Sequence, residues 1–272
     1  MFKLYDEKMN EIELPEGLIP LDIFISSIDK QRITTRVDGS NRTVNLGSTF
    51  NNREITLSIG FKSPDTQDYR LLRDMVAGVL TIEDEFYVAE TYQPGKKYLI
   101  SVDQHYIPTR LNKYVAHAEV ECTKIGLPFA ESIGTTQDIE ENGGITYDSE
   151  LWSYGMGLLH DDESHKYTHT SKEFEIYNAG SVAIHPFEQE LKIAIENVSS
   201  GYTLENLTTG DAFKYTGSSS GDIELNGPNI TLNNLQVLRD TNKEFITLAP
   251  GWNTFRQNQS RKVSFDFRFY YL

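Results

Sequence analysis

The residues best suited to nucleophilic chemistry lie in the second half of the chain. Residues 217–221 read Gly-Ser-Ser-Ser-Gly, which matches the nucleophile-elbow string G-x-S-x-G. That chemistry needs a strand before the serine and a helix after it, so that the hydroxyl lies at a helix N-terminus beside an oxyanion hole. The following residues, 222–232, alternate as strand and turn instead. We therefore expect residues 217–221 to form a flexible loop between strands.

A dense set of possible metal ligands occupies residues 160–169. Three imidazoles and three carboxylates in one segment can build a nitrogen–oxygen metal site. An acidic segment also produces such clusters by composition alone, and we favour this second interpretation, a solvated loop. The possible ligands are His160, Asp161, Asp162, Glu163, His165 and His169.

The two tryptophans are the candidates for carbohydrate contact. Trp152 precedes Ser153 and Tyr154, and Trp252 follows Gly251. Aromatic rings can stack on sugar rings, although a tryptophan more often packs in a core or against a neighbouring domain. Because 40 acidic residues offer many pairs, no carboxylate pair for glycoside cleavage can be singled out. We expect no catalytic residue, no metal site and no cofactor.

Composition narrows the class of protein. Among the 272 residues, 25 are Lys or Arg and 40 are Asp or Glu, so the formal net charge is -15. This balance argues against binding to nucleic acid, which needs a clustered basic face, and against an anionic membrane. No stretch approaches the roughly 20 apolar residues of a membrane helix, and residues 1–7 do not resemble a signal peptide. A single cysteine, Cys122, cannot form an internal disulfide.

Alternation of apolar and polar residues dominates the chain and predicts strands. The clearest runs are 55–59, 114–122, 191–195 and 263–271, the last of which we expect to be one strand with a single buried face. Between the runs lie turn signals such as Pro94-Gly95 and Thr209-Gly210-Asp211. The sequence therefore predicts a mainly β, almost entirely antiparallel protein.

One segment, at about residues 63–80, has the period of a helix. Ser63 is the expected N-cap, Pro64 the first helical residue, and Gly78 a plausible stop. The apolar stripe is either a partner-binding face or the cover of the domain's own sheet, and we favour the cover. The stripe consists of Tyr69, Leu72, Met75, Val76 and Val79.

Residues 131–144 read as a linker, because they are polar, acidic and Gly-containing without a period. Residues 1–130 before the linker hold 15 basic and 19 acidic residues, a net of -4. Residues 131–272 hold 10 basic and 21 acidic residues, a net of -11. We expect two domains, 1–130 and 145–272, that meet different partners.

Several segments together resemble the distal tail protein of long-tailed phages infecting Gram-positive bacteria, a family also described as siphovirus tail component. The first half carries one helix and closes with the long strand 113–125 and Gly126-Leu127-Pro128-Phe129. In the second half, residues 174–180 read Phe-Glu-Ile-Tyr-Asn-Ala-Gly. The most specific piece is Leu248-Ala249-Pro250-Gly251-Trp252-Asn253, ahead of the last aromatic strand.

This resemblance implies a structural protein of two β-sandwich-like domains without enzymatic activity. Residues 1–130 would form a ring-forming belt domain that assembles as a homo-hexamer. Residues 145–272 would form a galectin-like or carbohydrate-module-like jelly roll. The expected partners are the tail tube protein, a tail-associated lysin or tip protein, and a receptor-binding or fibre protein. The expected location is the tail tip of the virion, after assembly in the host cytoplasm.

Two alternatives from other classes remain open. The first is a carbohydrate-binding adhesion module that recognises host-wall glycans through Trp152 and Trp252, although no galectin sugar-binding signature is present. The second is a cell-wall hydrolase, which is disfavoured because no well-framed nucleophile or metal set occurs.

Overall fold

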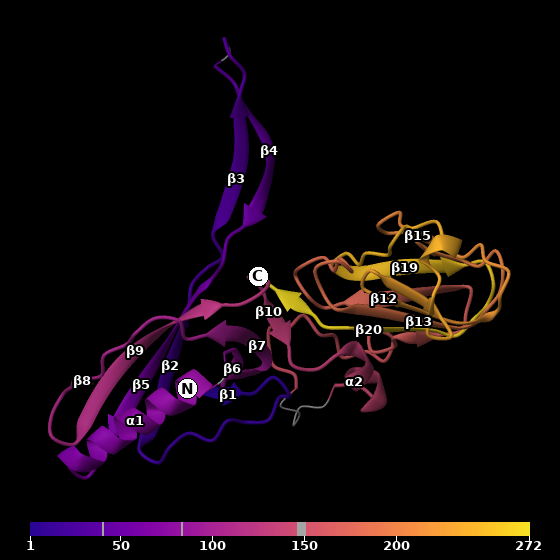
Figure 1. Ribbon diagram of the computed structural model, residues 1–272. Helices are drawn as coiled ribbons and strands as arrows, with labels where there is room; N and C mark the ends of the chain where they lie inside the picture. The colour runs from indigo at the N-terminus through magenta and orange to yellow at the C-terminus, as the bar shows by residue number, and fades with distance from the viewer. Residues whose placement is uncertain (40, 83, 146–150) are drawn as a thin grey trace. The chain divides into compact units, whose positions relative to one another are not determined.

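The computed structural model describes residues 1–39, 41–82, 84–145 and 151–272 of the chain. It divides into two compact units, Met1–Ala130 with Leu272 (unit 1) and Glu131–Tyr271 (unit 2). Both consist mainly of antiparallel strands with few helices, so the predicted mainly β class is confirmed (Figure 1). Five residues at the start of the expected second domain, 146–150, lie outside the described residues. No described helix has the length and apolar character needed to cross a bilayer.

Unit 1 is built around one antiparallel sheet with the strand order β1-β6-β7-β9-β5-β2, and β8 pairs with β9. Its central pair is β5 and β9, in which Leu57 lies opposite Val120 and both are fully buried. The predicted period of two is therefore realised in these strands. The strands are β1 (Phe2–Tyr5), β2 (Leu18–Ile25), β5 (Glu54–Lys62), β6 (Phe86–Glu90), β7 (Gln93–Ser101), β8 (Thr109–Arg110) and β9 (Val115–Lys124).

The single long helix, α1 (Thr66–Ile82), begins and ends later than predicted. Asp65, and not Ser63, caps it: the Asp65 carboxylate accepts hydrogen bonds from the backbone N–H of Gln67 and Asp68, at 2.7 and 2.9 Å. Gly78 lies inside the helix, because a single glycine costs only about 1 kcal/mol there and packing outweighs it.

The helix covers its own sheet, as favoured, through Tyr69, Leu72 and Val76, and the Tyr69 ring lies 6.3 Å from that of Phe61 on β5. Met75 was wrongly assigned to this buried stripe, since its side chain is 51% exposed. The buried face is narrower than the sequence pattern indicated.

Between β2 and β5 the chain forms a separate two-stranded hairpin of β3 (Lys30–Arg36) and β4 (Thr43–Phe50), which we call the arm. All residues of both strands are exposed. At its base the ring of Phe50 lies 5.7 Å from that of Phe129, and the Asn51 side chain donates to Asp29. These contacts at its base anchor the arm to unit 1, and Figure 1 shows it projecting from the rest of this unit.

Unit 2 contains a six-stranded and a four-stranded antiparallel sheet, with the orders β11-β20-β13-β16-β17-β18 and β12-β19-β14-β15. The first comprises β11 (Thr168–His169), β20 (Val263–Phe267), β13 (Leu191–Val198), β16 (Gly221–Asn226), β17 (Asn229–Leu232) and β18 (Leu235–Gln236). The second comprises β12 (Glu173–Asn178), β19 (Gly251–Gln257), β14 (Thr203–Asn206) and β15 (Ala212–Lys214), and a 3-10 helix η1 (Leu238–Asp240) follows β18.

Aromatic side chains from the two sheets of unit 2 meet in one core. Phe174 on β12 stacks on Phe255 of β19, with ring centroids 5.5 Å apart, and both approach Phe265 of β20, at 6.2 and 4.8 Å. All three rings are buried. The sheets therefore pack face to face.

The expected single strand over residues 263–271 is interrupted. β20 ends at Phe267, and the short β21 (Tyr270–Tyr271) pairs with β10 (Ala130–Ser132). The Phe269 N–H donates to the Ser132 hydroxyl at 3.0 Å, and Tyr270 is buried although the alternating pattern placed it outside. Alternation reports one buried face and does not show that this segment is enclosed on both sides.

The predicted linker 131–144 is wrong as a linker, because this segment is ordered and carries α2 (Thr136–Glu141). Thr135 and Asp138 form a capping box at its start. Thr136 is fully buried, and its hydroxyl donates to Phe265 O at 3.0 Å and accepts from Phe267 N at 3.1 Å. The polar residues that indicated a linker thus satisfy backbone groups along the edge of β20.

Replacing Thr136 by valine should lower the free energy of unfolding of unit 2 by about 1–3 kcal/mol, because the Phe267 N–H would be buried without a partner. Both tryptophans lie in unit 2, so tryptophan fluorescence during denaturant unfolding reports on this unit. The same change at exposed Thr170 serves as control and should alter the stability by less than about 0.5 kcal/mol. Equal effects of the two variants would contradict the edge-covering role.

Candidate functional site

The candidate nucleophile segment has no catalytic framework. Residues 217–220 connect β15 to β16, and the segment ends in a strand rather than a helix. The carbonyl oxygen of Ser219 accepts a hydrogen bond from the Tyr215 hydroxyl at 3.0 Å. The expectation of a loop between strands is therefore confirmed, and the requirements of a nucleophile elbow are not met.

The candidate metal ligands of residues 160–169 do not converge. His165 Nε2 lies 2.7 Å from Leu159 O, while His169 Nε2 lies 3.1 Å from Lys166 O and its ring stacks on Phe174 at 4.7 Å. Burial lowers the pKa of His169, so that the ring is neutral when the protein is folded at neutral pH. In the described part of the chain, no three His, Cys, Asp or Glu side chains come together as metal ligands.

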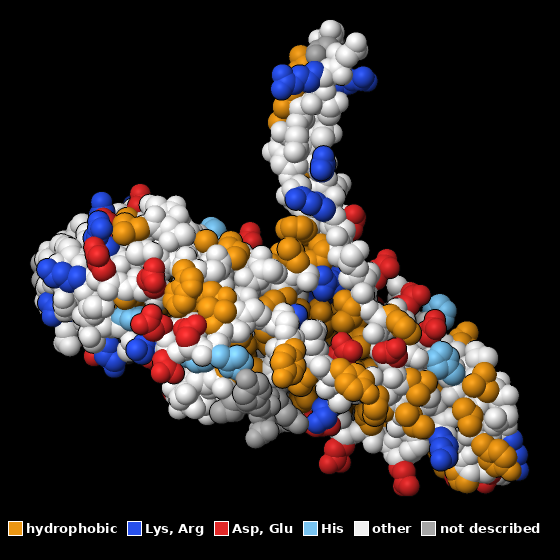
Figure 2. Space-filling model, turned by 180° about the vertical axis from the view of Figure 1, so that it is seen from behind, with side chains coloured by type: hydrophobic (Ala, Val, Ile, Leu, Met, Phe, Trp, Pro, Cys, Tyr) orange, Lys and Arg blue, Asp and Glu red, His pale blue; other side chains and the backbone are white. Residues whose placement is uncertain are grey.

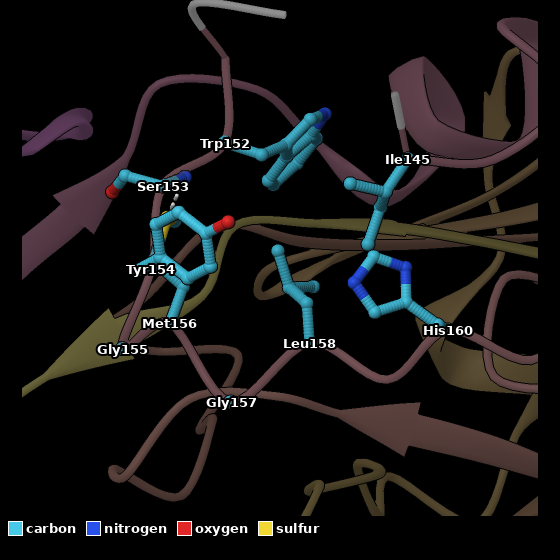
Figure 3. A pocket seen from close by; sticks show the side chains of 9 residues that line it. All are labelled: Ile145, Trp152, Ser153, Tyr154, Gly155, Met156, Gly157, Leu158 and His160. Carbon is cyan, nitrogen blue, oxygen red and sulfur yellow. Dashed lines mark hydrogen bonds between the residues drawn. The ribbon is translucent and has the colours of Figure 1, made fainter. Parts of the chain in front are cut away.

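Trp152 lies in the interior of unit 2. Only 7% of it is exposed, its ring lies 6.2 Å from that of Phe269, and a methyl group at Gly134 would be 2.8 Å from the indole. It lines a pocket of about 150 Å³, shown in Figure 3, at whose rim Tyr154 is 87% exposed. Because Trp152 is only 7% exposed, a sugar contact there would be confined to this pocket, and it stays a prediction. The pocket is also small for a ligand of saccharide size.

Trp252 is 37% exposed and lies opposite Tyr177 in the pairing of β19 with β12. Their ring centroids are 4.9 Å apart with an interplanar angle of 49°. The Tyr177 hydroxyl donates to Gly157 O at 2.8 Å, which fixes the ring. Of the two predicted contacts, only Trp252 presents an aromatic surface to solvent, and its contact with sugar stays a prediction.

The segment Leu248–Asn253 owes its sequence to a buried amide. Asn253 is fully buried: its Oδ1 accepts from Ala249 N at 2.8 Å, and its Nδ2 donates to Ala249 O at 2.8 Å and Gly251 O at 3.1 Å. Asn206 on β14 donates to the same Oδ1 at 3.2 Å. Gly251 has φ +82°, a conformation that favours glycine. This motif therefore forms the turn into β19 and ties it to β14.

Cys122 is buried on β9 and is the single cysteine of the chain. Burial raises the pKa of its thiol to about 12. The thiol is therefore neutral at physiological pH and unsuited to act as a nucleophile.

Residues 17–122, which run from just before β2 almost to the end of β9, match the family described as phage tail protein RIFT-related domain. The resemblance to phage tail components found in the sequence is thereby confirmed for this part of the chain. No curated protein matches the chain in sequence.

Among solved structures, the chain is similar to the Dit protein of phage SPP1, described as a paradigm of the hub adsorption apparatus in phages that infect Gram-positive bacteria. The TM-score is 0.68 with 12% sequence identity, over 99% of both chains. Chains of the phage p2 baseplate in its activated conformation with Sr and with Ca align with TM-scores of 0.43, at 9% and 11% identity. They cover 98% of this chain and 97% of theirs, but the agreement is too low for an argument.

The arm was not identified from the sequence as a functional element. A signal for it was present: basic residues alternate along β3, and Asp38-Gly39, with φ +80° at Gly39, marks a turn between two strand-like runs.

Replacing Asn253 by alanine should destabilise unit 2 by about 2–4 kcal/mol, because several buried polar groups lose their partner at once. Denaturant unfolding monitored by tryptophan fluorescence measures this loss. As a matched control, Asn226→Ala removes an exposed amide from a strand and should change the stability by less than about 0.5 kcal/mol. A small effect at Asn253 would mean that this amide does not hold the turn.

Proposed function

We propose that the chain is a structural hub at the distal end of a phage tail, where it assembles as a homo-hexamer. In this role it links the tail tube to the tip or baseplate and docks receptor-binding or fibre proteins. The observation that carries the proposal is the match of residues 17–122 to the phage tail RIFT-related domain. The SPP1 Dit fold over the whole chain supports it.

In this proposal unit 1 forms the ring, with the tail tube protein on one side and a tail-associated lysin or tip protein on the other. Its sheet has two end strands, β1 and β2, and carries the exposed arm. Closing a ring of subunits protects such edges and exposed faces. The proposed location is therefore the tail tip of the virion, following assembly in the host cytoplasm.

Unit 2 is the proposed docking surface for receptor-binding or fibre proteins, with a galectin-like arrangement of its two sheets. The residues from 131 onward hold 10 basic and 21 acidic residues, so this unit would select partners with basic surfaces. We propose no cofactor, metal, nucleic acid or membrane as a partner of either unit in this role.

The solution mass of the full chain tests the ring directly. We expect a mass that rises with concentration toward six times the 31.0 kDa of one chain, because association between copies follows mass action. Light scattering over a concentration series measures this mass, with repetition in high salt to test the electrostatic share. A strict monomer at every concentration would contradict self-assembly of the free protein.

A second candidate function is contact with cell-wall glycans, favoured by the exposed pair of Trp252 and Tyr177. If this surface binds sugar, Trp252→Ala should reduce retention on isolated cell walls about tenfold, because stacking on the indole would be lost. The matched control is Tyr154→Ala, which removes another exposed aromatic ring and should leave retention unchanged. Equal retention of the wild type and Trp252→Ala would remove this candidate.

A further inference from the structure

The arm exposes large apolar side chains on a hairpin that has no core of its own. Isolated two-stranded hairpins are marginally stable, and exposed apolar strands usually mark a surface that is covered in an assembly. In the described part of the chain, β3 and β4 pair only with each other. Their exposed apolar residues, with Val37 just beyond β3, are Ile33 (48%), Val37 (56%), Val44 (37%), Leu46 (63%) and Phe50 (43%).

Above its base the arm has two chemically different faces, whereas at the base Phe50 pairs with Lys30 and lies on the basic face. Lys30, Arg32 and Arg36 alternate along β3 and therefore share one face. Ile33 lies on the opposite face, as does Val44, which pairs with Thr35. Figure 2 shows basic side chains along the arm together with hydrophobic ones.

The charge of the arm is opposite to that of the rest of the protein. Residues 30–50 contain four basic residues and one acidic residue, a net of +3. The remaining 21 basic and 39 acidic residues leave a net of -18. A second copy of this chain is therefore an electrostatically attractive partner for the arm.

Unit 1 also has a groove that matches the arm in apolar character and in charge, because its lining combines apolar side chains with carboxylates. The groove runs beside the first turns of α1 and measures about 860 Å³, which is room for several side chains. Its apolar lining includes Leu71 (61% exposed), Met75 (51%) and Tyr114 (53%). Exposed Glu16 and Asp68 add two carboxylates to this lining, against the single ammonium group of Lys62.

We propose that the arm of one chain docks in this groove of a second copy, with its apolar residues on Leu71 and Met75 and its arginines toward Glu16 and Asp68. The two surfaces differ, so the contact is head-to-tail, which is the type that closes into a ring. The inference deepens the proposed assembly of unit 1 and rests on it, since it names the surfaces through which copies meet.

A charge swap tests this contact. The arm variant Arg32→Glu/Arg36→Glu should raise the concentration at which half of the full-length chains are assembled by about tenfold or more, because like charges would then face each other. Combining it with the groove variant Glu16→Lys/Asp68→Lys should restore assembly to within about threefold of the wild type. Light scattering over a concentration series measures both, and circular dichroism checks that each variant is folded.

The control Lys172→Glu/Lys214→Glu makes the same change in net charge on exposed lysines of unit 2 and should assemble like the wild type. If the wild type and the arm variant assemble equally, the arm contact is overturned while the proposed ring stands. The absence of rescue in the combined variant overturns the groove as the acceptor. A wild type that never assembles overturns the ring and the contact together. Unchanged assembly with arm-dependent binding of duplex DNA would replace this contact by a nucleic-acid one.

Discussion

The constraint on which the whole structure depends is that backbone N–H and C=O groups at strand edges must find partners. In unit 2 the chain meets this demand with its own side chains. The side chains of Thr136 and Gln137 donate hydrogen bonds to Phe265 O at the edge of β20, and the Ser132 hydroxyl accepts one from Phe269 N. The arm of unit 1 does the opposite, because its two strands pair only with each other in the described part of the chain. In unit 2, side chains of the same chain therefore satisfy these edge groups. Unit 1 instead presents the arm, an element suited to pair or pack with a second chain.

Buried amides carry much of the order in the four-stranded sheet of unit 2. Three asparagine side chains are at most 1% exposed, and each donates a hydrogen bond to a backbone carbonyl oxygen. The pairs are Asn178 with Val182, Asn206 with Thr247, and Asn253 with Ala249. A buried amide is stabilising only when its donors and acceptors are all used, and it then specifies one geometry. This explains why a Pro-Gly-x-Asn turn precedes β19: the glycine supplies the backbone angle and the asparagine holds the turn.

Different parts of the fold were predictable to different degrees. The strands β9 and β13 follow directly from alternation, because one face of each is buried and the other is largely not, whereas β5 is buried on both faces from Leu57 to Phe61. The helix was predictable as an element, yet its cap was misplaced, since Ser63 and Asp65 are both good caps and only the backbone geometry selects between them. Segment 131–144 could not be read correctly, because its polar residues are buried against a strand more than a hundred residues away in sequence. The burial of Trp152 was unpredictable for the same reason, because it depends on Phe269 and Gly134.

By itself, the sequence determined the mainly β class, the long helix, the turn residues of unit 2 and the resemblance to phage tail proteins. These features depend on periods of a few residues and on local backbone preferences, which are visible in a linear pattern. Only the tertiary structure decided that Trp252 is exposed and Trp152 enclosed, that the apparent linker is part of unit 2, and that β3 and β4 form an arm. The physical reason is that exposure and edge pairing depend on which distant segments meet, and a period of two reports a face without naming its partner.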